Sequence, residues 1–282
     1  MSETALGELN MIYFEVHAGL CNRLRGMASA YAFAKDTNQK LTVIWESDVN
    51  CNCKFDTLFN LSADIPVKVI NLDCMGNGIM KKAEHQINKC RKLYMKLKSD
   101  TVIELREIPT VSELRELNEK SINGKNLYLK SCHDWYKCDN PFDIFKLQSN
   151  VEKRVDGLIQ ECRKTEHKCV GVHIRRTDHQ DCIANSPTSA FIKAMEEEPN
   201  DTVFYIASDD ELERKNLEKK FGKERIKYNN MADLSRGTIQ GMEDAVVDLY
   251  VLAGMDKILG SEGSSFTDMA AMINGTPIVR CH

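Results

Sequence analysis

The sequence predicts an α/β protein of two domains, each built around a parallel β-sheet. Short apolar segments rich in β-branched and aromatic residues alternate with helical segments, and this alternation begins again after residue 168. With 282 residues the chain is long enough for two mid-sized domains. We expect a first domain over residues 1–164 and a second over 165–282. We also expect the carboxyl edges of the two sheets to face each other across a cleft, a usual place for a nucleotide-containing substrate.

The first domain opens with a strand, a turn and a helix. Residues 11–16 form a predicted strand that runs into the small-residue turn His17-Ala-Gly-Leu. Residues 22–35 place small and apolar side chains at helical spacing without a proline, and 41–45 form a second buried strand. This order of β-strand, loop, helix and β-strand predicts parallel strands. Further strands are expected at 101–105 and 126–131, and a helix at 151–164.

Residues 79–98 predict a basic amphipathic helix. Seven Lys and Arg residues are interspersed with apolar residues that recur at helical spacing. Such a helix can bind a membrane surface or anions, but a solvated helix face is the commoner explanation. We therefore expect a surface helix here, with membrane or anion binding as the alternative.

The second half repeats the alternation of strands and helices. Its first strand, 169–174, is continuously apolar except for one histidine. Further strands are expected at 202–207, 257–259 and 277–280, and helices at 187–197, 210–221, 242–255 and 265–273. The repeated alternation makes both domains Rossmann-like.

Composition and charge exclude several functional classes. The chain has 38 Lys and Arg against 42 Asp and Glu, a net charge of −4, so we expect no nucleic-acid partner. No apolar run is long enough for a transmembrane segment, and the first residues lack a basic leader before an apolar core. Eleven cysteines, an odd number in a long chain, indicate free thiols in a reducing compartment. We therefore expect a cytoplasmic protein.

The sequence contains no strong metal motif. Cys51-Asn-Cys53 lacks a second tight pair of ligands, so we expect these cysteines to be buried or incidental rather than bound to zinc. An Asp-x-Asp loop, common where Mg²⁺ or Mn²⁺ holds a diphosphate, is also absent from the sequence. We therefore expect neither a metal nor another cofactor.

The strand at 169–174 leads directly into two arginines and an aspartate, Arg175, Arg176 and Asp178. A guanidinium group stays charged and matches a phosphate with two hydrogen bonds, so a diphosphate leaving group is a natural ligand whose growing charge would be stabilised there. The competing interpretation is a structural pair in which one arginine bridges Asp178. His173, one residue inside the strand, is by itself expected to be a hydrogen-bonded core histidine.

Two further strands deliver polar groups to their carboxyl ends. Ser208 and Asp209 follow one strand and are candidates for hydrogen bonds from a base or ribose, whereas Asp210 is expected to cap the next helix. Another strand enters a glycine- and serine-rich turn that opens a helix, where amides and hydroxyls hold phosphate oxygens; an ordinary serine cap is the alternative. Asp248, on the helix before that strand, either reaches the cleft or faces water. The candidates in the turn are Ser261, Ser264 and Ser265.

The turn after the first strand combines small residues with polar candidates. It matches neither the dinucleotide-binding Gly-x-Gly-x-x-Gly motif nor the Gly-x-x-x-x-Gly-Lys-Ser/Thr phosphate loop. Gly19 would still let a ligand approach the backbone amides, Asn22 could bond a phosphate or a sugar hydroxyl, and Arg23 could face the opposite domain. The four clusters together predict anion-binding groups on facing edges of two sheets.

These segments together resemble the fucosyltransferase superfamily, which includes nodulation and core α1,6-fucosyltransferases and protein O-fucosyltransferases. The resemblance rests on Gly171-Val-His-Ile-Arg-Arg-Thr-Asp178, Tyr205-Ile-Ala-Ser-Asp-Asp210, the segment 248–266 and the turn Gly19-Leu-Cys-Asn-Arg-Leu-Arg25. It covers nearly all of the second half and one turn of the first. The resemblance implies a GT-B fold, GDP-fucose as donor, and inversion at the anomeric carbon without a required metal.

The resemblance also assigns roles to the candidates. Arg175 would hold the β-phosphate with Arg176 assisting, and Asp178 would fix the following loop. The other implied contacts are the nucleoside for Asp209 and Asp210, the guanine pocket for Asp248, the diphosphate for Ser264 and Ser265, and the donor-facing loop for Asn22. His173, Ser208, Ser261, Gly19 and Arg23 complete the predicted donor-binding set.

The region of the general base differs from the family that this chain resembles. The core α1,6 enzymes place a catalytic glutamate a few residues after the arginine pair, where this sequence has Ile183. Asp181 is the nearest carboxylate and our predicted base, with His179 in reserve. We predict an inverting glycosyltransferase that transfers fucose from GDP-fucose to a glycan or glycoconjugate hydroxyl. The alternatives are another donor, such as GDP-rhamnose, GDP-mannose or a UDP-sugar, and a non-catalytic binding module.

Overall fold

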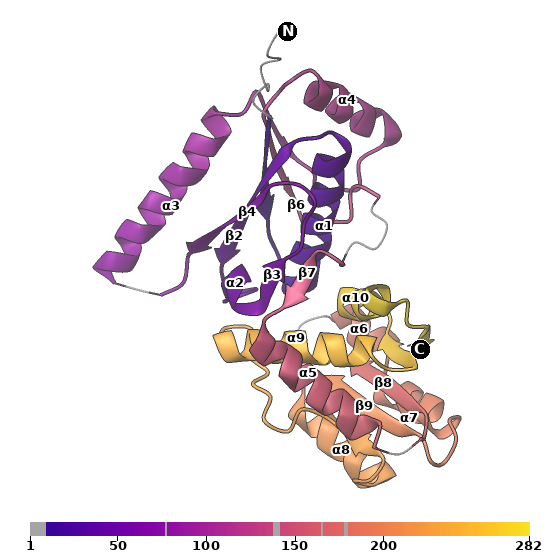
Figure 1. The fold of residues 1–282 in the computed structure, drawn as a ribbon. Coiled ribbons are helices and arrows are strands. Elements are labelled where there is room, and N and C mark those ends of the chain that lie inside the picture. Colours follow the sequence, from indigo (N-terminus) through magenta and orange to yellow (C-terminus); the bar gives the residue numbers. More distant parts are fainter. Residues whose placement is uncertain (1–9, 77, 138–141, 165, 178–179) are drawn as a thin grey trace. The chain divides into compact units, whose positions relative to one another are not determined.

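The computed structural model describes residues 10–76, 78–137, 142–164, 166–177 and 180–282. The chain forms two units, Met1–Lys146 and Leu147–His282, each with its own five-stranded parallel sheet (Figure 1). The predicted α/β class with two Rossmann-like sheets is confirmed. The division between the units places helix α5 (Ser149–Cys162) in the second unit, whereas the sequence boundary assigned it to the first domain. The reason is that α5 packs against helix α9 (Ile239–Ala253).

The sheet of the first unit has the strand order β4-β2-β1-β6-β5, with all neighbours parallel. Its strands are β1 (Met11–Val16), β2 (Lys40–Ser47), β4 (Val67–Asp73), β5 (Thr101–Glu104) and β6 (Leu127–Ser131). Strands β3 (Phe59–Leu61) and β7 (Phe145–Leu147) form a separate two-stranded sheet. The helices are α1 (Leu20–Asp36), α2 (Phe55–Leu58), α3 (Ile79–Leu97) and α4 (Val111–Ile122).

Opposite faces of the first sheet are covered by very different helices. Successive side chains of a strand point to opposite faces. Trp45 of β2 therefore faces α1, where the Arg23 guanidinium lies over its ring, while the adjacent Ile44 packs with Met95 of α3. Helix α1 is buried along most of its length, because small and apolar residues occupy nearly all its positions. Helix α3 buries few of its residues.

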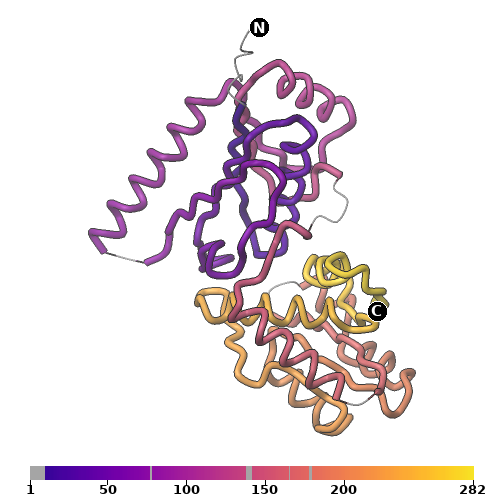
Figure 2. Tube along the Cα trace, in the orientation of Figure 1, coloured from indigo at the N-terminus to yellow at the C-terminus, as the bar shows by residue number. Residues whose placement is uncertain are grey.

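The sheet of the second unit has the order β10-β9-β8-β11-β12, again all parallel, which is the Rossmann order 3-2-1-4-5. Its strands are β8 (Cys169–Ile174), β9 (Val203–Ser208), β10 (Ile226–Lys227), β11 (Lys257–Ser261) and β12 (Ile278–Cys281). Besides α5 and α9, its helices are α6 (Gln180–Asn185), α7 (Thr188–Glu196), α8 (Glu211–Phe221) and α10 (Ser265–Asn274). The C-terminal helix α10 packs beside α9 (Figure 2).

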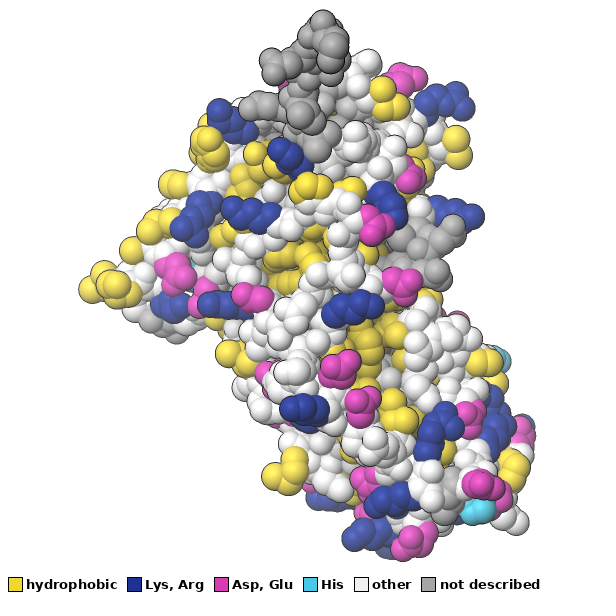
Figure 3. All heavy atoms as spheres, in the orientation of Figure 1, with side chains coloured by type: hydrophobic (Ala, Val, Ile, Leu, Met, Phe, Trp, Pro, Cys, Tyr) yellow, Lys and Arg dark blue, Asp and Glu magenta, His cyan; other side chains and the backbone are white. Residues whose placement is uncertain are grey.

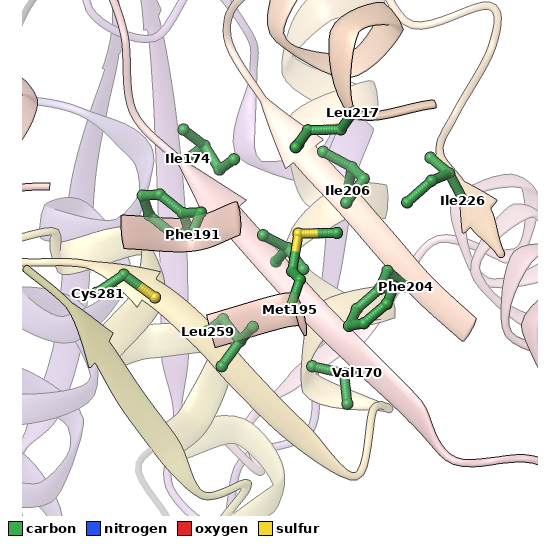
Figure 4. Packing of buried hydrophobic residues seen from close by; sticks show 11 residues of the cluster. Val170, Ile174, Phe191, Met195, Phe204, Ile206, Leu217, Ile226, Leu259 and Cys281 are labelled. Carbon is green, nitrogen blue, oxygen red and sulfur yellow. The ribbon is translucent and has the colours of Figure 1, made fainter. Parts of the chain in front are cut away.

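The alternation of side chains along β8 and β9 gives the second sheet two distinct faces. One face carries an apolar core shared with α7 and α8 (Figure 4). Its strand and helix residues include Val170, Val172, Ile174, Phe204, Ile206, Phe191, Met195 and Leu217. The other face meets α9 and α10, where Tyr205 bonds Asp248 of α9 and His173 bonds Thr267 of α10. Polar side chains of the sheet therefore meet polar partners on the α9–α10 side.

None of the described helices is both long enough and apolar enough to cross a membrane.

Candidate functional site

The candidate site lies at the carboxyl edge of the second sheet, between β8 and β11. From β8 the chain continues to β9 on one side, and from β11 it continues to β12 on the other. Ligands of open α/β sheets bind at this point, where the strand order reverses. Arg175 follows the last residue of β8, and Ser261 is the last residue of β11. The structure thus brings two of the sequence-predicted clusters to one place.

Ser261 joins the ends of the two strands. It is fully buried, its hydroxyl donates to the carbonyl of His173 at 3.3 Å, and it accepts from the amide of Arg175 at 3.1 Å. Both bonds are made to the backbone of β8. We infer that Ser261 positions the arginine backbone and does not present its own hydroxyl to a ligand.

His173 is the core histidine that its position in the strand predicts. It is buried, its Nδ1 lies 2.7 Å from Thr267 Oγ1, and its ring stacks on Phe266 with 4.7 Å between centroids. Burial, reinforced by the charge of Arg175, lowers the pKa of His173 to about 3. The imidazole is therefore neutral at physiological pH, and it supports the first turn of α10.

The two arginines after β8 have different partners, because successive residues point to different sides. The Arg176 guanidinium turns towards α7 and α8, where it donates to the Ser186 carbonyl at 3.1 Å and pairs with Glu213 at 3.0 Å. It also donates to Thr188 Oγ1 at 3.1 Å. The Arg175 Nε instead lies 3.5 Å from Asp209 Oδ2, beside the β8–β11 edge. The Arg176 guanidinium is therefore bound into the fold, whereas the Arg175 side chain pairs with Asp209 at the candidate site.

Asp209 organises the loop after β8. Its Oδ1 accepts from the amide of Arg176 at 2.7 Å, and its Oδ2 accepts from the Thr177 hydroxyl at 2.7 Å. Burial alone would raise the pKa of Asp209, but these hydrogen bonds and the charge of Arg175 lower it below its usual range. Asp209 is thus an ionised group that holds the arginine loop, a role that the sequence did not predict.

The neighbours of Asp209 serve the fold as well. Asp210 caps α8 by accepting from the Leu212 amide at 2.8 Å, which confirms the predicted capping role. The buried Ser208 hydroxyl accepts from the amide of Asp210 at 3.2 Å, and its carbonyl accepts from Arg214 at 2.6 Å. These contacts anchor the start of α8 to the end of β9.

Asp248 neither faces water nor lies on the surface of the unit. It is buried between α9 and β9, where it accepts from the Tyr205 hydroxyl at 2.6 Å and pairs with Arg214 at 3.5 Å. Burial raises the pKa of Asp248 to about 6, although Arg214 and Tyr205 act in the opposite direction. The structure therefore corrects the expectation of a water-facing carboxylate.

The turn between β11 and α10 has the features of an anion site. Gly263 adopts a φ of 66°, a left-handed conformation that favours glycine. Ser264 is the N-cap residue of α10, but its hydroxyl accepts no capping hydrogen bond from the described residues. The first amides of α10, beginning at Ser265, and the positive end of its dipole lie at the same sheet edge as Arg175. This arrangement can bind a phosphate group.

Two residues that support this turn were not among the sequence candidates. A Cβ atom on Gly260 would come within 2.2 Å of Thr267 Cγ2, so β11 and α10 can approach each other only with glycine here. Arg280, in β12, donates to the Ser261 carbonyl at 2.8 Å and pairs with Asp268 of α10. The rule that selected the other candidates, a polar residue near the carboxyl end of a strand, would also have selected Arg280.

Asp181, the predicted base, lies on the short helix α6 and is exposed. Helix α6 contacts β11, and Ser186, which follows α6, accepts a hydrogen bond from the amide of Glu262 at 2.8 Å. The segment carrying Asp181 is therefore attached to the turn before α10. Asp178 and His179 lie outside the described residues.

The candidates in the first unit lie at the start of α1. Gly19 is the N-cap residue of α1, and the Oδ1 of Asn22 is buried without a hydrogen bond from the described residues. Arg23 is fully buried, and its guanidinium pairs with Asp48 at 2.7 Å and donates to the Ala18 carbonyl at 2.7 Å. Arg23 therefore points into its own unit, contrary to the expectation that it faces the other domain.

None of the cysteines that the structure describes forms a disulfide. Cys51 and Cys53 are buried, and burial raises the pKa of the Cys51 thiol to about 12. Within the described part of the chain, no group of three or more His, Cys, Asp or Glu side chains is placed to hold a metal ion.

Comparison with known proteins identifies the fold. No family model and no curated protein matches this sequence. The structure of fucosyltransferase NodZ from Bradyrhizobium is similar with a TM-score of 0.62 and 18% identity, covering 96% of this chain and 95% of that one. The structure of an Arabidopsis thaliana FUT1 variant in complex with GDP is similar with a TM-score of 0.65 and 14% identity, covering 97% of this chain and 70% of that one. The structure of POFUT1 in complex with GDP-fucose is similar with a TM-score of 0.59 and 10% identity, covering 99% of both chains. The two-unit chain thus shares the GT-B fold of the fucosyltransferases.

Proposed function

We propose that this protein is an inverting glycosyltransferase that transfers fucose from GDP-fucose to a hydroxyl of a glycan or glycoconjugate. The observation that carries the proposal is Arg175 beside the start of α10 at the β8–β11 edge. The fold adds support, because similar structures include NodZ soaked with GDP-fucose and NodZ co-crystallized with GDP. We also propose a cytoplasmic location and an acceptor-binding role for the first unit.

In the proposed reaction, the second unit binds the donor diphosphate. The guanidinium of Arg175 and the first amides of α10 bind its oxygens, and Asp209 holds the arginine in place. As the bond between the anomeric carbon and the phosphate oxygen breaks, negative charge grows on GDP, and these fixed positive groups stabilise it. Since the arginine and the helix dipole supply this charge, we expect a chelator to leave turnover unchanged.

The acceptor must lose a proton as its oxygen attacks the anomeric carbon. Asp181 is the proposed base, because it is an exposed carboxylate on a helix that contacts β11. The new bond forms on the face opposite the departing diphosphate, so the configuration inverts. We expect Asp181→Asn to reduce the rate of transfer without weakening GDP binding, and full activity in this variant would assign the base elsewhere.

The test combines binding and turnover. A thermal-shift panel of GDP, UDP, ADP and their sugars identifies the donor, because a ligand that binds only the native state raises the melting temperature. Release of GDP from the stabilising sugar nucleotide is then measured with a set of acceptors. Arg175→Ala should lower the rate at least ~100-fold, the usual scale for a fixed charge at a leaving group. Lys215→Ala, an exposed residue on α8 of the same unit, is the matched control.

The outcomes distinguish the alternatives. Stabilisation by GDP-rhamnose or GDP-mannose in preference to GDP-fucose would change the donor. Stabilisation by GDP without turnover on any acceptor would favour a binding module. No stabilisation by any nucleotide would contradict the proposal.

A further inference from the structure

Helix α3 contacts its sheet through its polar face. Asn88 donates to the Asp73 carbonyl at 2.9 Å, Lys81 pairs with Asp73 at 2.5 Å, and Lys92 pairs with Glu46 at 2.8 Å. Met95 is the apolar exception, because it packs into the small cluster beneath the helix. This is the reverse of the usual amphipathic helix of a globular protein, which faces its core with an apolar stripe.

The outward face of α3 is consequently apolar. Six large apolar side chains of α3 are at least half exposed, and at 100° per residue they fall within an arc of about 140°. They are Ile79 (86%), Met80 (84%), Ile87 (52%), Leu93 (57%), Tyr94 (60%) and Leu97 (76%). We call this set the α3 stripe. Figure 3 shows hydrophobic side chains along the outer edge of α3, with Lys and Arg side chains beside them.

Basic side chains border the α3 stripe on both sides. At helical spacing, Lys82 and Lys89 fall on one border, and Arg91 falls on the other. All three are exposed, and none forms an ion pair with a carboxylate of the described chain. The one acidic residue of α3, Glu84, pairs with Lys81 at 3.0 Å. The outward face therefore combines an apolar centre with uncompensated positive borders.

We propose that the α3 stripe docks this protein on an anionic membrane surface. Apolar side chains with an aromatic residue would enter the boundary between headgroups and acyl chains, while the long Lys and Arg stems keep their charges among anionic headgroups. A second copy of the same helix fits this face poorly, because both borders are positive and like charges would meet. The charge complementarity therefore favours lipid. This inference is independent of the donor and of the transfer reaction.

Vesicle co-sedimentation of the whole chain tests the proposal. Vesicles of phosphatidylcholine with phosphatidylserine are compared with vesicles of phosphatidylcholine alone. We expect binding to the anionic vesicles to be at least ~10-fold stronger and to weaken with salt. The double variant Ile87→Gln/Leu97→Gln should lose about 10-fold in binding, because it removes apolar area from the stripe. Both positions are exposed, so the fold should be retained, which a thermal melt checks.

A matched control has the same chemistry on another helix of the same unit. Val111→Gln/Ile122→Gln changes two exposed apolar residues of α4 and should bind vesicles like the wild type. Wild-type protein that does not sediment with anionic vesicles would overturn the proposal, as would a stripe variant that binds undiminished. If the wild type forms a dimer in sedimentation velocity and the stripe variant is a monomer, the face binds a second copy of this chain instead. No donor or acceptor is present, so failure here is separate from failure of the proposed function.

Discussion

Arg176→Ala should destabilise the second unit without removing the nucleotide binding proposed for it. The side chain is only 11% exposed, and its partner Glu213 is 9% exposed. Truncating the arginine leaves a buried carboxylate whose remaining side-chain partner is Thr188, at 2.6 Å. Breaking such a pair by removing one member costs about 3–5 kcal/mol. At about 3 °C per kcal/mol, the melting temperature should fall by roughly 10 °C.

Urea unfolding followed by far-UV circular dichroism measures the free energy of unfolding, and a thermal melt measures the melting temperature. The rise in melting temperature that GDP causes is the second readout. Arg175→Ala should show the opposite pattern, with nearly wild-type stability and little stabilisation by GDP. Glu213→Gln in the Arg176→Ala background should restore part of the lost stability, because it removes the unpaired charge. An exposed ion pair contributes up to about 1 kcal/mol. If the free energy of unfolding of Arg176→Ala lies within that range of the wild-type value, the structural role of Arg176 is refuted.

Three further predictions concern the same unit. Because the pKa of Asp248 is raised to about 6, its contribution to stability is present below pH ~4 and is lost as the pH rises through 6. The difference in unfolding free energy between the wild type and Asp248→Asn should therefore fall by about 1.4 kcal/mol per pH unit between pH 4 and 6. A difference that does not change with pH would contradict this prediction. His173 contributes an opposite slope that is common to both proteins and cancels. Gly260→Ala should cost about 1–3 kcal/mol through its clash with Thr267, measured by urea unfolding, and a neutral result would show that α10 can shift. Asp210→Ala removes the N-cap of α8 and should lower the free energy of unfolding by about 1 kcal/mol, measured in the same urea unfolding experiment. Asp210→Ser should retain most of this stability, because serine is also a good N-cap residue.

The regular elements with strong periodicity could be predicted from the sequence. The strands at Met11–Val16 and Cys169–Ile174 and the helix at Ile79–Leu97 lie within about a residue of their expected bounds, because their patterns are local. Strand β4 and helix α4 were not predicted. Half-buried β4 has no continuous apolar run, and α4 buries only two residues. The order of the strands could not be predicted, because it depends on contacts between distant segments.

The location of the candidate site was predicted better than the roles of its residues. Polar residues at the carboxyl ends of parallel strands meet at one sheet edge, which brought Arg175 and Ser264 into the candidate set. Partners decide the roles, and the partners are distant in the sequence. Arg176 pairs with Glu213, Asp209 holds the loop at Thr177, and these pairings leave no local pattern. A local pattern indicates where charge gathers, but not which charges the fold itself neutralises.

The polar underside of α3 also determines how firmly this helix is held. Helix α1, on the opposite face, is attached by burial of apolar area, whereas α3 relies mainly on ion pairs of Lys81 and Lys92. Salt screens ion pairs and barely affects apolar burial. Rising ionic strength should therefore loosen one cover of the first sheet and leave the other in place.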